Sequence, residues 1–433
     1  QTANNTVVEQ TTAAYFQFKL GGDFGSMPFD ILTGLRYETT DVDSSSLASA
    51  YKTVWEDNND VAIRVDSSKP ASLATAEASY DNLLPSLDFT LHISDDMVGR
   101  FSVGKTIARA GLGALGVSAS GFGAGGGSTF LGSNPVASAS NPGLLPLESS
   151  NIDMSLEWYF DDTSYVSGGI FQKNIKNFIG SERINRTLLG IRNSTNGPRV
   201  QAAAAELRAK GIALNDDTLF NQAVYNQFGK GSADWIAQFG GSDYTGTDAQ
   251  NFFLANHPGW DLESRDEDPL TMFSTNTPNN GRDAKIYGAE FAVQHFFGDT
   301  GFGVQANYTI VRADGIRFDN EGSFTTSQFA LVGLSDTANL VAMYEKDGLQ
   351  ARIAYNWRDT YLNETNRGGS ANPRYIEAYS QIDLNVSYEV TEALTVSLEG
   401  LNITGENSRS HGRNYAMMWD MYDLGARYQL GAR

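Results

Sequence analysis

Cysteine is absent from the 433 residues, and histidine occurs only at His92, His257, His295 and His411. Without cysteine the chain can form no disulfide, no thiolate-bound metal site and no cysteine nucleophile, and the absence fits an oxidising compartment. The histidines show no HxxxH-like spacing, and no GxSxG motif occurs. The absence of these motifs argues against a metal-dependent or serine hydrolase, and the sequence predicts no catalytic residues.

Long apolar runs and basic character are missing as well. Hydrophobic residues make up 41% of the chain and its mean hydropathy is -0.32. No stretch approaches the ~18 consecutive apolar residues that a membrane-spanning helix needs. The opening QTANNTVVEQTTAAY has neither the basic start nor the apolar centre of a signal peptide. A net charge of -20 argues against a nucleic-acid partner, because phosphate binding needs a basic face.

What the chain does contain is a repeated alternation of apolar and polar residues. Clear examples are AYFQFKL from Ala14, IDMSLEWYF from Ile152, LQARIAYNWR from Leu349 and QIDLNVSYEV from Gln381. Each pattern predicts a strand with one apolar and one polar face. Many of these segments have the ~9–11 residues that a tilted strand needs to cross a bilayer. Their polar faces carry charged residues, which suits a hydrated interior with the apolar side chains facing lipid.

The connections between the segments alternate between short and long. Short turns such as ISDDM, YFDDTS and EKDG are rich in Asp and Gly, whereas long polar loops run at about 39–82, 111–150 and 174–282. A helix is predicted at 201–212, inside the longest loop. Tight periplasmic turns opposite long external loops are typical of bacterial outer-membrane barrels. We therefore predict an all-β fold in which residues 1–433 form part of a transmembrane antiparallel β-barrel with long extracellular loops.

The strand count adds a further expectation. We count about 13 strands, whereas single-chain bacterial barrels close with an even number. The pattern therefore predicts that barrel strands are missing before Gln1. A soluble β sandwich, which would turn its apolar faces inward, is the competing fold.

Two nucleotide-binding expressions occur in the sequence. Gly99–Thr106 (GRFSVGKT) matches the P-loop expression and Gly111–Gly116 (GLGALG) fits the dinucleotide fingerprint. The first lies in an alternating strand pattern and the second opens a Gly/Ser/Ala-rich segment without a βαβ context. Both are therefore interpreted as a strand and a loop, and no cofactor is predicted.

Candidate substrate-binding residues lie in the predicted loops and on the polar strand faces. Trp260, Tyr361 and Trp419 could stack on a sugar or grip an iron chelate, or they could pack within loops. Arg352 and Arg358 are predicted to face the lumen, where they could contact an anionic substrate or hold a plug domain.

Acidic clusters stand at 57–60 and at 261–268, in two of the predicted external loops. Loops rich in oxygen ligands can bind calcium. The alternative interpretation is a solvated, like-charged loop surface.

The C-terminal segment LTVSLEGLNITGENSRSHGRNYAMMWDMYDLGARYQL resembles the closing hairpin of TonB-dependent receptors. Three earlier segments resemble the same family: LLPSLDFTLHISDDMVGRFSVGKTIARA, SSNIDMSLEWYFDDTSYVSGGIFQKNIKNFI and NNGRDAKIYGAEFAVQHFF. The resemblance covers nearly the whole chain apart from the loop interiors.

The resemblance implies a 22-stranded barrel filled by an N-terminal plug that TonB engages to drive uptake of a scarce solute. By that comparison about nine strands are missing from this chain, together with the plug and the TonB-engaging segment. The usual terminal aromatic is replaced by Arg433. The missing barrel half is expected in the same or in a separate chain.

The partners that the resemblance implies are outer-membrane lipid and lipopolysaccharide, the TonB system acting through the plug, and a small molecule or oligosaccharide as substrate. A passive porin or adhesin-like barrel and a soluble β-rich carbohydrate-binding protein are the alternative functions.

Overall fold

The computed structural model describes residues 5–56, 59–324, 328–367 and 372–433. Within these ranges thirteen strands form one continuous antiparallel path, and β7 and β8 attach to it through β12. The expected all-β fold with about 13 strands is confirmed. In their order across the sheet, the path strands are β1 (Asn5–Phe24), β2 (Met27–Ala48), β5 (Ser72–Ser94), β6 (Met97–Ala108), β9 (Leu147–Asp161), β10 (Ser164–Arg192), β12 (Leu270–Phe296), β13 (Phe302–Asp314), β14 (Thr337–Lys346), β15 (Leu349–Arg358), β18 (Tyr379–Thr391), β19 (Leu394–Leu401) and β22 (Arg427–Ala432).

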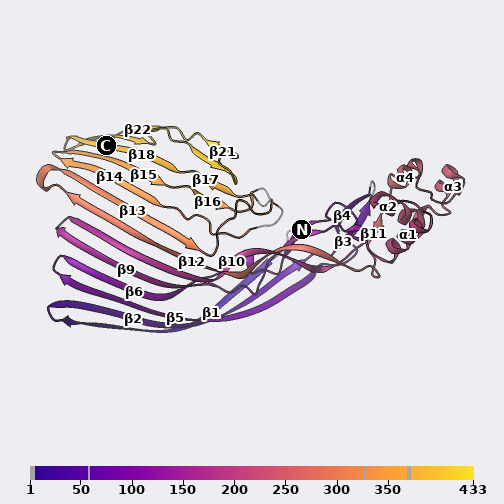
Figure 1. The fold of residues 1–433 in the computed structure, drawn as a ribbon, viewed down its shortest axis with the longest axis horizontal. Helices are drawn as coiled ribbons and strands as arrows, with labels where there is room; N and C mark the ends of the chain where they lie inside the picture. Colours follow the sequence, from indigo (N-terminus) through magenta and orange to yellow (C-terminus); the bar gives the residue numbers. More distant parts are fainter. Residues whose placement is uncertain (1–4, 57–58, 325–327, 368–371) are drawn as a thin grey trace.

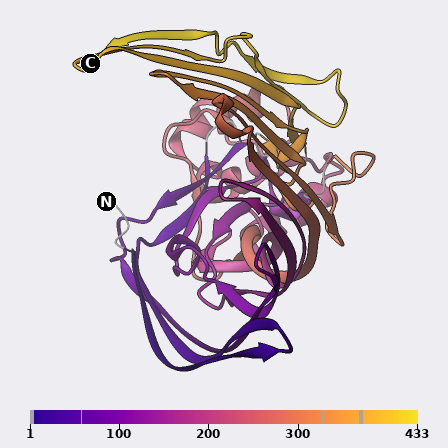
Figure 2. The same ribbon diagram turned by 90° about the vertical axis from the view of Figure 1, so that its left-hand side faces the viewer.

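The sheet curves into an open arc (Figures 1 and 2). Each path strand pairs with its neighbours, but β1 pairs only with β2, and β22 only with β19, among the described strands. Figure 2 shows these two end strands on opposite sides of the opening. Two sheet edges are therefore unpaired within the described part of the chain.

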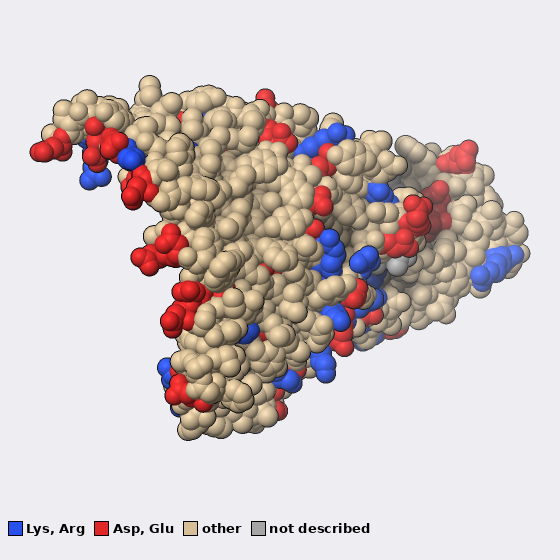
Figure 3. All heavy atoms as spheres, turned by 60° about the vertical axis from the view of Figure 1, so that its left-hand side comes forward, with Lys and Arg blue, Asp and Glu red and all other residues tan. Residues whose placement is uncertain are grey.

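The alternating sequence pattern places apolar side chains on the convex face. Phe16, Leu156 and Ile353 are 62%, 48% and 44% exposed. Figure 3 shows a broad band with almost no charged side chains, bordered by carboxylates at the turn end and by mixed charges toward the other end. This is the surface expected of a wall whose outside contacts lipid tails.

The connections are short at one end of the arc and long at the other. In the hairpin between β14 and β15, Asp347 and Gly348 both adopt positive φ, of 51° and 76°. An Asp-Gly pair favours this geometry, because a two-residue hairpin turn needs left-handed backbone at both positions.

The long connections contain more strand than the sequence predicted. β2 and β5 stay paired as far as Ala48 and Ser72, so much of the expected loop at 39–82 is a continued hairpin. β10 likewise runs to Arg192 and β12 begins at Leu270, which shortens the expected loop at 174–282. Beyond the apolar band these strands continue as paired polar hairpins.

A helical extension fills the connection from β10 to β12 (Figure 1). It contains α1, which confirms the predicted helix at 201–212, and three further helices that the sequence analysis did not predict. A small sheet in the order β11-β3-β4 packs beside them. The bounds are α1 (Pro198–Ala209), α2 (Asp216–Val224), η4 (Tyr225–Gly229), α3 (Ala233–Phe239), α4 (Asp248–Ala255), β3 (Tyr51–Glu56), β4 (Asp60–Val65) and β11 (Leu262–Glu263).

A second small sheet, in the order β16-β17-β20-β21, covers the loop end of the C-terminal strands. No helix in the described ranges is long and apolar enough to cross a membrane. The P-loop-like segment Gly99–Thr106 lies within β6, which confirms its interpretation as a strand. The remaining elements are β7 (Ala119–Gly123), β8 (Val136–Ala139), β16 (Tyr361–Glu364), β17 (Arg374–Ile376), β20 (Ser408–His411), β21 (Met418–Tyr422), η2 (Leu112–Ala114), η3 (Thr129–Leu131) and η5 (Gly298–Thr300).

Candidate functional site on the inner wall

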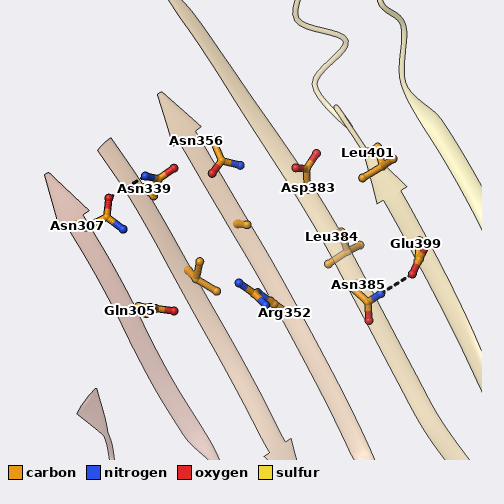
Figure 4. Close-up of a pocket in the computed structure, with 12 residues that line it drawn as sticks. Gln305, Asn307, Asn339, Arg352, Asn356, Asp383, Leu384, Asn385, Glu399 and Leu401 are labelled. Carbon is orange, nitrogen blue, oxygen red and sulfur yellow. Dashed lines mark hydrogen bonds between the residues drawn. The ribbon is translucent and has the colours of Figure 1, made fainter. Parts of the chain in front are cut away.

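A hollow of about 540 Å³ lies against the inner, polar face of β13, β14, β15, β18 and β19 (Figure 4). Eight of its twelve lining residues are polar or charged. The lining residues are Gln305, Asn307, Asn339, Val341, Arg352, Ala354, Asn356, Asp383, Leu384, Asn385, Glu399 and Leu401.

Strand register gathers these side chains from distant parts of the sequence. Asn307 lies opposite Asn339, which lies opposite Asn356, and Asn356 in turn lies opposite Gln381. A second row runs from Arg352 through Asn385 to Glu399. Because side chains alternate between faces, every second residue of each strand reaches the same wall. A polar face in each strand therefore becomes a continuous polar surface once the strands pair.

Side-chain amides dominate the hydrogen bonding of this surface. Asn339 Nδ2 donates to Asn307 Oδ1 at 2.8 Å, and Asn385 Nδ2 donates to Glu399 Oε1 at 3.0 Å. An amide both donates and accepts, so each of these groups keeps capacity for a further partner. Arg352 forms no ion pair with any described residue. The surface therefore offers amides, the Arg352 guanidinium and the carboxylates of Asp383 and Glu399 to a hydrated solute.

The inner wall of the N-terminal strands has a different character. Arg100 donates to Glu157 at 2.9 Å, and Ser102 donates to Asp88 at 2.6 Å. A smaller hollow of about 360 Å³ lies beside them and is also lined by Lys173. Here Arg100 and Glu157 form an ion pair across neighbouring strands, and Asp153, Lys173 and Glu290 also line the hollow, whereas the C-terminal half presents mainly amides.

The structure separates the predicted substrate-binding residues into four places. Arg352 lines the inner hollow. Arg358 lies at the loop end of β15, with its guanidinium 3.7 Å from the centre of the Tyr361 ring. Trp419 lies in β21 and donates to the Pro373 carbonyl at 3.0 Å. Trp260 lies apart in the helical extension.

Trp260 packs within that extension. Its ring stacks on His257, with ring centres 3.7 Å apart, and on Phe228, with ring centres 6.0 Å apart. Ligand contact by Trp260, Tyr361, Trp419, Arg352 and Arg358 stays a prediction. Asn307, Asn339 and Asn385 were not among the residues predicted to bind substrate, although the period-two pattern placed Asn307 and Asn385 on polar strand faces.

The acidic loop at 261–268 is partly neutralised by nearby cations. Glu263 lies 2.6 Å from Lys52, and the buried Asp268 lies 3.1 Å from Arg199. The described residues hold no group of three or more His, Asp or Glu side chains able to hold a metal ion. In the other acidic cluster Asp57 and Asn58 lie outside the described residues. Calcium binding stays a prediction for both clusters.

Ion pairs organise the small sheet above the inner hollow. Asp420 lies 2.7 Å from Arg374 and 3.1 Å from Arg367. Burial acts to raise the pKa of Asp420, but hydrogen bonds from Ser410 and Arg374 and the two positive charges outweigh it and lower the pKa below 3.8. The carboxylate is therefore ionised at neutral pH and joins β17 to β21.

Comparison with known proteins supports this architecture. The family model described as TonB dependent receptor-like, beta-barrel matches residues 1–270 and 261–403. No curated protein sequence matches the chain.

Solved structures of several receptors have a similar fold. The ferric-catecholate import receptor Fiu from E. coli, in a closed form, is 13% identical with a TM-score of 0.53, over 98% of this chain and 45% of the receptor. The ferric enterobactin receptor PfeA from Pseudomonas aeruginosa, in complex with BCV-L6, is 11% identical with a TM-score of 0.50, over 99% and 55%. The siderophore receptor PirA from Acinetobacter baumannii is 12% identical with a TM-score of 0.48, over 98% and 54%.

The chain therefore spans about half the length of these solved receptors. At these identities the likeness concerns the fold, whereas the family model matches most of the sequence. An apolar convex face, a polar concave face and the matched sequence all agree with the expectation drawn from the C-terminal motif. The chain belongs to the TonB-dependent receptor-like β-barrel family, whose members lie in the outer membrane of Gram-negative bacteria.

Proposed function

We propose that this chain forms part of the wall of an outer-membrane receptor that captures a scarce solute outside the cell and passes it inward along the polar inner face. The observation that carries the proposal is the continuous row of amides from Asn307 through Asn339 and Asn356 on the concave side. Such a row can exchange hydrogen bonds with a moving solute, while the convex face stays in lipid. The proposed function requires that the solute binds and moves along the inner face, and it involves no covalent step.

Completion of the wall is part of the proposal. The outer edges of β1 and β22 leave backbone N–H and C=O groups unpaired among the described strands. In hydrocarbon each unsatisfied backbone group costs several kcal/mol, so only closed barrels span membranes as sheets. We place further strands between these two edges, contributed by the same polypeptide or by a separate chain.

Energy coupling is proposed to act through a plug in the enclosed space, engaged by TonB. Family membership supports this coupling. The wall around Arg100 and Glu157 is suited to hold a folded domain, because it combines an ion pair with the charged side chains of Asp153, Lys173 and Glu290, which can pair with groups on the plug. The amide-lined wall on the other half is suited to the solute path.

The substrate class that fits this path best is a polar organic solute rich in hydroxyl groups, such as an oligosaccharide. Asparagine amides match hydroxyls because both groups donate and accept hydrogen bonds. Tyr361 and Trp419, near the loop end of the same strands, could stack on sugar rings. Arg352, Asp383 and Glu399 add charged partners for further hydroxyl groups of such a solute.

Uptake measurements on intact cells test the coupling. With radiolabelled oligosaccharides as probes, we expect accumulation that depends on the receptor and stops when TonB is deleted or the proton gradient is collapsed. Accumulation that continues without TonB would identify a passive porin and overturn the coupled mechanism.

Substitutions on the inner wall test the path. Asn339→Leu removes an amide from the row and should lower uptake several-fold while the barrel still assembles. Ser387→Leu is the matched control, because Ser387 faces the same side of β18 but does not line the hollow. Equal uptake by both variants would place the path elsewhere.

A further inference from the structure

A second hollow lies on the convex face and is apolar. It is a shallow groove of about 450 Å³ between β5, β6, β9, β10 and β12. Its walls are the side chains of Phe89, Phe101, Met154, Leu156, Ile170 and Phe291. Met154, Leu156, Ile170 and Phe291 are each about half exposed. The groove therefore lies within the band that faces lipid.

Two glycines form the floor of the groove. Gly99 of β6 and Gly168 of β10 lie in one register row, on either side of Leu156. Glycine weakens a strand and often marks a site where another group approaches closely. The absent side chains at these two positions are what hollows the surface between the phenylalanines.

Neither glycine is explained by backbone conformation or crowding. A Cβ at Gly99 would lie 3.4 Å from the end of the Ile93 side chain, and one at Gly168 would lie 3.5 Å from the Phe291 ring, both ordinary contacts. Neither residue has a positive φ. By contrast, a Cβ at the neighbouring Gly169 would lie 3.3 Å from the Met154 carbonyl oxygen, so that glycine has a packing reason. We read Gly99 and Gly168 as residues kept small for an external ligand.

The depth of the groove assigns it to one leaflet. Gly99 lies three residues beyond Asp96 in the short turn, which is about 10 Å along the strand. Short turns face the periplasm in this family of barrels. The groove therefore lies in the periplasmic half of the bilayer, away from the lipopolysaccharide leaflet.

Groups suited to a lipid headgroup lie between the groove and the turns. Trp158 packs on Phe160 with ring centres 5.2 Å apart, and Phe160 packs on His295 with ring centres 5.4 Å apart. The tryptophan and histidine rings suit the membrane interface, where an apolar body meets a polar edge. The turn between β9 and β10 carries Asp161 and Asp162.

We propose that this groove binds one acyl chain of a zwitterionic phospholipid of the periplasmic leaflet, with its headgroup at Trp158 and His295. An ammonium group on the headgroup would face the turn carboxylates, which would repel a purely anionic lipid. The apolar lining, its position in the lipid-facing band and the acidic rim together define this occupant. The inference rests on membership of the barrel family and not on the identity of the transported solute.

Photo-crosslinking with the receptor purified from outer membranes tests the proposal. The receptor, with any chains that accompany it, is reconstituted in nanodiscs that contain phosphatidylethanolamine with a photoactivatable acyl chain. We expect lipid adducts at Met154 and Ile170 several-fold more frequent than at Leu340 of β14, which is similarly exposed on the same convex face. A photoactivatable phosphatidylglycerol should give fewer adducts in the groove.

Filling the groove provides the matched comparison. Gly168→Leu and, independently, Gly99→Leu should each reduce the adducts at Met154 to the level of Leu340. Ala342→Leu, an exposed convex-face position on β14, should leave the adducts unchanged. Equal adducts at Met154 and Leu340 in the unaltered receptor would overturn the proposal, as would crosslinks between two copies through the groove. Equal labelling by both lipids would overturn the headgroup assignment.

Discussion

The barrel wall and the helical extension place the same residue types in opposite positions. In the wall Leu340 is 47% exposed on the convex face, and in the extension Leu207 is fully buried. The extension packs its helices around a core that includes Phe220, Trp235 and Tyr244. The difference shows that the surrounding medium, water or lipid, determines whether apolar side chains lie inside the protein or on its surface. In water they must meet one another, whereas in a bilayer the lipid tails already provide an apolar contact.

Their sources of stability differ accordingly. In the wall, long strand ladders satisfy the backbone, as the unbroken pairing of β1 with β2 shows. In the extension, side-chain packing and capped helices hold the fold, since Asn215 and Thr218 form a capping box at the start of α2. We therefore expect the two regions to respond to different substitutions.

The largest expected effect is on the extension core. Trp235 is fully buried among Tyr225, Phe239 and Phe253. Trp235→Ala should destabilise the extension by about 3–5 kcal/mol, because a large cavity replaces the ring. Hydrogen exchange should show opening of residues 198–255 while strand amides of the wall stay protected.

The control for this change is Phe252→Ala in α4, where the ring is 72% exposed and little packing is lost. If Trp235→Ala also exposes the wall amides, the two regions do not fold as separate units.

The next effect concerns the lipid-facing side of the wall. Ile353 points outward near the middle of β15, while Gln350 faces the interior. Ile353→Arg should destabilise the inserted barrel by about 2–4 kcal/mol, because the charge must enter hydrocarbon. Gln350→Arg should be tolerated. Folding yields in lipid vesicles, read from heat-dependent gel mobility, provide the measurement, and equal yields would contradict the assignment of faces.

The smallest effect concerns the sheet formed by β16, β17, β20 and β21, which is held by ion pairs. Asp420→Asn should loosen β21 by about 1.5–3 kcal/mol, because two arginines lose a charged hydrogen-bond partner. Since the pKa of Asp420 is lowered in the folded state, its contribution is present above pH 3.8 and is lost as the pH falls through the lowered value.

Hydrogen exchange of β21 as a function of pH checks this. The unaltered protein should loosen there on acidification, whereas Asp420→Asn should be loose at neutral pH and show little further change. If Asp420→Asn loosens on acidification as the unaltered protein does, the ion pairs of Asp420 do not cause the pH dependence of β21.

Much of the wall could be read from the sequence. Its alternation follows from the two faces of a strand, and the Asp-Gly turn at 347–348 fixes a hairpin by backbone geometry alone. The amide row could not be read in the same way. Asn307 and Asn356 were visible as polar-face residues, but their alignment with Asn339 depends on strand register, which the sequence does not state.

The extension was predicted less completely for a different reason. α1 was visible because its Ala-rich segment favours a helix, while α3 and α4 are short and depend on packing. Their start signals were nevertheless present, since Ser232 and Thr247 cap the two helices. The packing of Trp260 against the extension core could not be foreseen, because its partners Phe228 and His257 come together only in the folded extension.

The orientation of the strand faces is tested most directly by scanning β15 with single cysteines, which the cysteine-free chain permits. Spin labels at 350–357 in reconstituted receptor should alternate. Labels at Ala351, Ile353 and Tyr355 should be relaxed by oxygen dissolved in lipid, and those at Arg352, Ala354 and Asn356 by a water-soluble nickel complex. If both sets respond alike, or if the odd positions are closed to both reagents, the lipid-facing wall and the transport path drawn along its inner side are wrong.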